Sequence, residues 1–136
     1  MALSPQRTRF EAEQPRVLQT LRPIPLLVLT TSYQTVLTAR TDADFLISHL
    51  YVCETSNAAR TVNVCLVPPA GSPGTTNALL YTYPVTAYAT EAMIGAIDLV
   101  VPPGYTIQAL GSANTSLNIY VWGYDLTGTQ VSGGLQ

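Results

Sequence analysis

Turn-forming residues interrupt this sequence so often that they leave no room for a long helix. Ten prolines and nine glycines are spread over its 136 residues, and no stretch keeps apolar residues at the 3.6-residue period of an amphipathic helix. Between the turns, apolar and β-branched residues alternate with polar ones, and a new turn follows about every 8–12 residues. This pattern predicts an all-β fold, an antiparallel β-sandwich or jelly roll of about seven or eight strands.

Several segments have the composition and alternation of strands. They are residues 26–38, broken near Thr31 and Ser32, followed by 45–53, 61–67, 79–83, 93–101, 105–109 and 117–124. In 45–53 both faces are largely apolar, so we expect a central strand that is covered on both sides. One face should carry Phe45, Ile47, His49, Tyr51 and Cys53, and the other Leu46, Ser48, Leu50 and Val52.

The two cysteines, Cys53 and Cys65, flank a polar segment formed by residues 54–60. Its length suits a hairpin between the strands at 45–53 and 61–67. Such a hairpin would place the cysteines almost opposite each other, within the Cα separation that a disulfide allows. No signal peptide is visible in the first residues, which favours a reducing compartment where both thiols stay free and buried.

The first 25 residues differ from the rest of the chain. They hold four of the ten prolines and four of the six arginines, and they carry a net charge of +2, whereas residues 26–136 carry −4. Frequent prolines favour extended backbone. We therefore divide the chain into an extended N-terminal docking arm (1–25), a β-sandwich (26–124) and a tail (125–136). The alternative for 1–25 is an ordinary loose terminus. The residues expected to make the docking contacts are Arg7, Arg9, Phe10, Arg16, Val17, Leu18, Leu21 and Arg22.

The low charge of the chain limits its partners. Only 10% of the residues are charged and the net charge is −2, so the chain lacks the basic patch typical of nucleic-acid binding. No segment approaches the roughly 20 apolar residues of a membrane helix. We expect no nucleic-acid or membrane partner. A surface of Thr, Ser, Asn, Gln and Tyr suits contact with other protein instead.

Residues that could carry chemistry have simpler structural interpretations. His49 is the single histidine, and its apolar strand favours a buried imidazole bonded to a carbonyl over a catalytic base. Asp42 and Asp44 are better explained as a polar turn than as paired catalytic carboxylates. The sequence has no nucleophile elbow, phosphate-binding glycine motif or zinc-ligand set. We predict that the chain is not an enzyme and has no catalytic, metal-binding or cofactor-binding residues.

Most of the eight tyrosines lie in or beside the expected strands. Three roles stay open for them: cross-strand packing, a subunit interface shared with Trp122, and a platform that binds a carbohydrate or another ligand. The tyrosines concerned are Tyr51, Tyr81, Tyr83, Tyr88, Tyr105, Tyr120 and Tyr124.

Two stretches resemble small β-sandwich virion proteins of tailed bacteriophages. Residues 46–64, LISHLYVCETSNAARTVNV, follow the family's order of strand, "TSNAARTV"-type turn and strand. Residues 101–109, VPPGYTIQA, and 116–124, SLNIYVWGY, resemble its closing pair of strands. The resemblance covers about 80 residues and rests on short motifs.

This resemblance implies a structural virion protein of the capsid cement or decoration type. Such a protein is made in the host cytoplasm, binds the major capsid protein on the outer capsid surface and is commonly a homotrimer. The family has no catalytic residues to transfer to this chain. A basic arm ahead of a compact sandwich favours a cement protein. The alternative is a tail or fibre component with a receptor- or carbohydrate-binding role.

Overall fold

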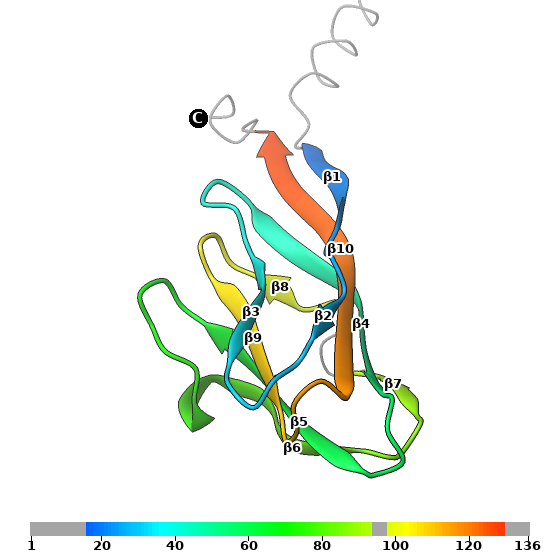
Figure 1. The fold of residues 1–136 in the computed structure, drawn as a ribbon. Helices are drawn as coiled ribbons and strands as arrows, with labels where there is room; N and C mark the ends of the chain where they lie inside the picture. Colours follow the sequence, from blue (N-terminus) through cyan, green and yellow to red (C-terminus); the bar gives the residue numbers. More distant parts are fainter. Residues whose placement is uncertain (1–15, 94–97, 130–136) are drawn as a thin grey trace, which may run out of the picture.

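The computed structural model describes residues 16–93 and 98–129, which form two antiparallel sheets packed face to face (Figure 1). Sheet A has the order β1-β10-β4-β7, with β2 paired to β10 and β8 paired to β4; sheet B has the order β3-β9-β5-β6. The strands are β1 (Arg16–Pro23), β2 (Leu27–Val28), β3 (Gln34–Thr38), β4 (Asp44–Glu54), β5 (Arg60–Val67), β6 (Ala78–Val85), β7 (Thr90–Ala92), β8 (Val100–Val101), β9 (Thr106–Gly111) and β10 (Leu117–Thr129). A single 3₁₀ turn, η1 (Thr75–Asn77), precedes β6.

The core lies between the two sheets and is made of the inward residues of alternating strands. Sheet A contributes Phe45, Leu50 and Ile119, and sheet B contributes Val64 and Ile107, all with no exposed surface. Burying a side chain of this size stabilises the fold by about 1.5–3 kcal/mol relative to leaving it in water. The interior is therefore closed by side chains from strands that are far apart in the sequence.

The predicted β-sandwich is confirmed, with ten described strands instead of seven or eight. The excess comes from strands of two or three residues (β2, β7 and β8), which are too short to produce an alternating pattern. The break near Thr31 and Ser32 is confirmed as the link between β2 and β3. The alternation of β9 and β10 is also confirmed, since Ile107, Ala109 and Val121 point into the core.

The predicted faces of the 45–53 strand are wrong beyond its fifth residue. Trp122 of β10 pairs with His49 whereas Gly123 pairs with Ile47, so Ser48 is an extra residue in β4. An extra residue shifts the alternation by one place. Consequently Phe45 and Ile47 face the core before the bulge, and Leu50 and Val52 face it afterwards. The other face of β4 is half-buried rather than fully covered.

The predicted hairpin between 45–53 and 61–67 is also wrong. β4 pairs with β10, β7 and β8 in sheet A, whereas β5 pairs with β6 and β9 in sheet B. Cys53 and Cys65 thus lie in different sheets, and both thiols are free as expected. Cys65 is buried, but Cys53 is half-buried on the outer face of sheet A.

The crossing from sheet A to sheet B is held by the buried carboxylate of Glu54, which has no exposed surface. Glu54 Oε1 accepts a hydrogen bond from the Ser56 N–H at 2.7 Å, and Oε2 accepts one from the Ser116 hydroxyl at 3.2 Å. The Thr55 N–H donates to the Ser116 carbonyl at 2.8 Å. These bonds tie the connection to the residue before β10, which directs the chain into the second sheet.

The domain boundaries predicted from composition do not coincide with the ends of the sheets. Residues 16–23 of the expected arm form β1, which pairs with β10 in a continuous register from Arg16–Thr129 to Pro23–Trp122. β10 itself runs through 125–129, which we expected to belong to the tail. The backbone of 16–23 is extended, as its prolines indicated, but it is the edge strand of sheet A. The predicted strand at 93–101 lies partly outside the described residues, and its end forms β8.

Candidate interaction surface

The outer face of sheet A carries a continuous set of apolar and aromatic side chains. Residues that pair directly across antiparallel strands share a face, so the register assigns its members. The face contains Gln19, Leu21, Pro23, Leu26 and Val28 beside β10, then Asn118, Tyr120, Trp122, Tyr124 and Leu126 on β10, then Asp44, Leu46, His49, Tyr51 and Cys53 on β4, and Thr90, Ala92 and Val100 on β7 and β8.

Four rings on this face form an aromatic ladder, which we define as Tyr51, His49, Trp122 and Tyr124. The His49 ring stacks on Trp122 with 4.4 Å between ring centroids, and on Tyr51 with 5.7 Å. The Tyr124 ring meets Trp122 edge to face at 6.2 Å. Stacked and edge-to-face pairs at these separations stabilise the sheet beyond the area they bury. The ladder is therefore a preformed, rigid surface.

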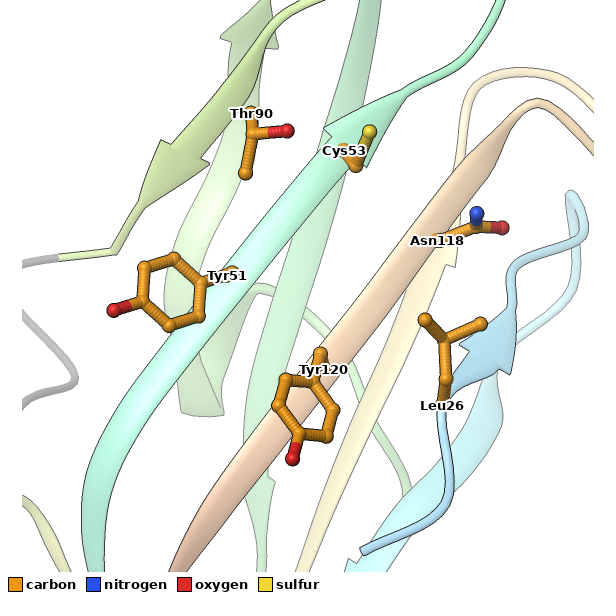
Figure 2. Close-up of a pocket in the computed structure, with 6 residues that line it drawn as sticks. All are labelled: Leu26, Tyr51, Cys53, Thr90, Asn118 and Tyr120. Atoms are coloured by element: carbon orange, nitrogen blue, oxygen red, sulfur yellow. The ribbon is translucent and has the colours of Figure 1, made fainter.

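A hollow of about 520 Å³ lies at one end of the same face. Figure 2 shows Tyr51 and Cys53 along β4, Asn118 and Tyr120 along β10, and Leu26 and Thr90 at the two sides. The rings of Tyr51 and Tyr120 stand up from neighbouring strands at one end of this hollow. Its walls are almost entirely carbon, so it suits an apolar or aromatic group.

Exposure and charge distinguish this face from the rest of the described surface. Eight large apolar side chains are exposed among the described residues, and five of them lie on this face: Leu21, Leu26, Val28, Val100 and Tyr120. Asp44, at one end, is the one acidic or basic residue among the described strand positions of the face. The outer face of sheet B is polar by contrast, with Thr35, Thr38, Thr106 and Gln108 along β3 and β9.

The predicted arm residues are placed unevenly. Arg7, Arg9 and Phe10 lie outside the described residues. Arg16 and Val17 begin β1. Leu18 and Leu21 are exposed, at 58% and 55%, on opposite faces of the strand.

Arg22, the last of the predicted arm residues, is engaged within its own chain. Its Nε lies 3.3 Å from Oδ1 of the buried Asp125, an ion pair without hydrogen-bond alignment. Its Nη2 donates to the Thr38 carbonyl at 2.9 Å, and its guanidinium carbon lies 4.9 Å from the centre of the Phe45 ring. Arg22 thereby closes one end of the sandwich, which our sequence analysis did not foresee.

The candidate chemical residues take structural positions. His49 is half-buried in the ladder rather than buried against a carbonyl, and its Nδ1 lies 3.0 Å from the Ser48 hydroxyl. Asp42 accepts two hydrogen bonds from the Arg40 guanidinium, each at 2.9 Å, in the turn before β4. Hydrogen bonding to Arg40 lowers the pKa of Asp42, and the same bond raises the pKa of Arg40.

Two kinds of site were also sought in the described ranges. Within 16–93 and 98–129, no group of three or more His, Cys, Asp or Glu residues is arranged to hold a metal ion. The same ranges contain no helix with the length and apolar character needed to cross a membrane.

Solved structures share this fold. A chain of the Bacillus endospore appendages, which form disulfide-linked pili, aligns with a TM-score of 0.52 and 13% identity over 84% of this chain and 90% of its own length. A chain from the viral particle of infectious bursal disease virus aligns with a TM-score of 0.51 and 14% identity over 83% of this chain and 31% of its own. Identities this low establish a common fold only. No protein-family model and no curated protein sequence matches the chain.

The sequence indicated part of this surface. The alternation of 117–124 already set Tyr120, Trp122 and Tyr124 on the side opposite the core. It did not indicate that Leu26 and Thr90 would border the same hollow, because they join it through pairing or packing against distant strands.

Proposed function

We propose that this chain is a structural virion protein, a cement subunit that binds the outer surface of a bacteriophage capsid and stabilises the shell. The observation that carries the proposal is the outer face of sheet A. Soluble monomers rarely expose a contiguous apolar patch larger than a few hundred Å², and this face spans a whole sheet with one acidic residue at its end. Such a surface suits permanent contact with other protein.

The two-sheet body supports a mechanical rather than a chemical role. Its strands are held together by long-range pairing, and its core is filled by side chains from both sheets. The two similar folds with TM-scores above 0.5 come from a pilus and a viral particle, which is consistent with a non-enzymatic building block. Many copies of a stiff body can reinforce a shell even when each contact is weak.

The N-terminal arm supplies the second contact in this proposal. Arg7 and Arg9 precede β1, and arginine suits bidentate pairing with carboxylates, here those of the major capsid protein. An arm tethered to a docked body binds at high effective concentration, so two weak contacts combine into firm attachment. Self-association, with the homotrimer that the resemblance implies, would multiply this effect.

The arm contact is tested by sedimenting the full chain with purified capsid shells of the virus that encodes it. Replacing both Arg7 and Arg9 with alanine should weaken binding and reduce its dependence on salt concentration, because two ionic contacts are lost. The control is Arg40→Ala, which removes an exposed arginine from the turn before β4. Full binding by the Arg7→Ala, Arg9→Ala protein would refute the arm, and no binding by the wild type would refute the cement role.

A second candidate function is favoured by the aromatic ladder. Stacked rings on an exposed sheet can bind the apolar faces of sugars, as a tail or fibre component would require for its receptor. A glycan array with the full chain tests this candidate. Specific binding that is lost in Trp122→Ala would support it, and an array without signal would remove it.

A further inference from the structure

We propose that copies of this chain associate through the outer face of sheet A, each burying this face against the same face of a second copy. The inference deepens the proposed function by naming the surface of self-association, and it rests on the assignment of the chain to an assembly. It concerns the protein alone in solution, so it can be tested without a capsid.

Charge favours a second copy over a foreign partner. A face that meets itself brings identical charges together, which is destabilising when those charges are numerous. Here Asp44 is the one acidic or basic strand residue on the described face, and it lies at the end of β4 near Leu126 rather than at the centre. A foreign partner selected by charge would find almost nothing to recognise, whereas an identical apolar face meets no repulsion.

Shape favours an arrangement with twofold symmetry. The hollow lies at the Asn118 end of β10, and the Trp122 and Tyr124 rings of the ladder lie toward the other end. Six residues separate Asn118 from Tyr124, which is about 20 Å along a strand. A twofold axis through the middle of the face would bring the ladder of each copy over the hollow of the other. In an isologous contact one such fit is made twice.

The size of the face is adequate for this contact. Strands spaced about 4.8 Å apart and rising about 3.3 Å per residue give the four strands of the β1-β10-β4-β7 path a footprint of about 500 Å² between residues 118 and 126 of β10. The relief of the side chains adds to this planar area. The result approaches the roughly 800 Å² that each partner buries in a stable interface.

The test compares two tyrosine-to-glutamate variants of the full chain by sedimentation equilibrium. Tyr120 is 39% exposed on this face, and Tyr81 is 54% exposed on β6 of sheet B. The wild type should be oligomeric at tens of micromolar. Tyr120→Glu should weaken association by at least about tenfold, because a carboxylate at the centre of an apolar interface loses its hydration. Tyr81→Glu should associate like the wild type.

A second measurement covers the case in which Tyr120→Glu does not fold. Cys53 lines the hollow and is half-buried, whereas Cys65 has no exposed surface. In the wild type, a maleimide should therefore modify Cys53, and its rate should fall as the protein concentration rises through the association range. A labelling rate that does not change while oligomers form would place the interface elsewhere and overturn the inference.

Other outcomes are equally decisive. A wild type that stays monomeric, or a folded Tyr120→Glu that associates normally, overturns the inference. Glycan binding that protects Cys53 in a monomer would assign the face to a sugar instead. A wild type that associates through this face but ignores capsid shells would refute the cement role and leave the inference intact, whereas a monomer that binds shells would do the reverse.

Discussion

Replacing Gly123 with alanine tests the bulge that sets the outer face of sheet A. An added Cβ would overlap the Leu46 carbonyl oxygen and would lie 3.0 Å from the Leu46 carbonyl carbon and 3.1 Å from the Ile47 Cα. All three are backbone atoms of β4, so no side-chain rotation can relieve the overlap. β10 and β4 would have to separate at the point where the bulge aligns Trp122 with His49.

The magnitude follows from the parts that must move. Overpacking strain costs about 1–3 kcal/mol, and weakening two neighbouring ladder hydrogen bonds costs about 1 kcal/mol each. Gly123→Ala should therefore lower the free energy of unfolding by about 3–4 kcal/mol, a large share of the roughly 5–15 kcal/mol typical of a domain. For a chain of this length, the Tm should fall by roughly 10 °C.

The assay is urea denaturation with thermal melting, and the chain offers a matched control. An added Cβ at Gly74 has no neighbour within 4 Å, and its φ of 177° is extended backbone that any residue adopts. Gly74→Ala should stay within about 0.5 kcal/mol of the wild type. If Gly123→Ala is as stable as Gly74→Ala, the close approach of β10 and β4 is wrong.

Three further predictions follow from the described contacts. Deleting residues 1–15 should leave the Tm unchanged, whereas deleting 1–22 should lower it sharply because β1 is lost; equal melting curves would show that β1 is not part of the sheet. Glu54→Gln should cost about 1 kcal/mol and Glu54→Ala about 3 kcal/mol in urea, since the amide still accepts a hydrogen bond at this buried position; equal losses would contradict the assigned bonds. NMR titration should give Asp42 a pKa below its ordinary value, so its ion pair with Arg40 stabilises the fold above the unfolded pKa of about 3.9 and is lost as the pH falls through the folded pKa. In Arg40→Ala, the Asp42 pKa should rise toward the ordinary value, and an unchanged pKa would exclude the ion pair in solution.

The sequence predicted the features that depend on local pattern. Alternation in 105–109 and 117–124 located β9 and β10 and their inward residues correctly, because a half-buried strand repeats every two residues. It also located the break between β2 and β3. The paired prolines and glycine at Pro102, Pro103 and Gly104 correctly indicated a turn, in which Gly104 has a φ of +79°.

The features that depend on distant partners could not be predicted. The bulge at Ser48 arises from the way β4 lies against β10, about 70 residues later, and nothing near Ser48 indicates it. The polar segment 54–60 has the length of a hairpin, but Glu54 fixes it to Ser116 and sends the chain to the other sheet. Residues 16–23 were assigned to an arm because prolines and arginines dominated their composition.

The arm assignment also overlooked what a charged residue can do inside a chain. Arg22 neutralises the buried Asp125 across a strand pair that joins residues about 100 positions apart. A charge count along the sequence cannot show such a partner. The docking role therefore stays a prediction for Arg7, Arg9 and Phe10, and the chemistry of Arg22 belongs to the fold.

The most direct test of the account is the number of copies of this chain in a purified virus particle, measured by quantitative mass spectrometry against the major capsid protein. A cement subunit that covers the shell should be present in hundreds of copies, in a fixed ratio to the capsid protein. A handful of copies would place the chain in the tail, and its absence from particles would contradict the structural role.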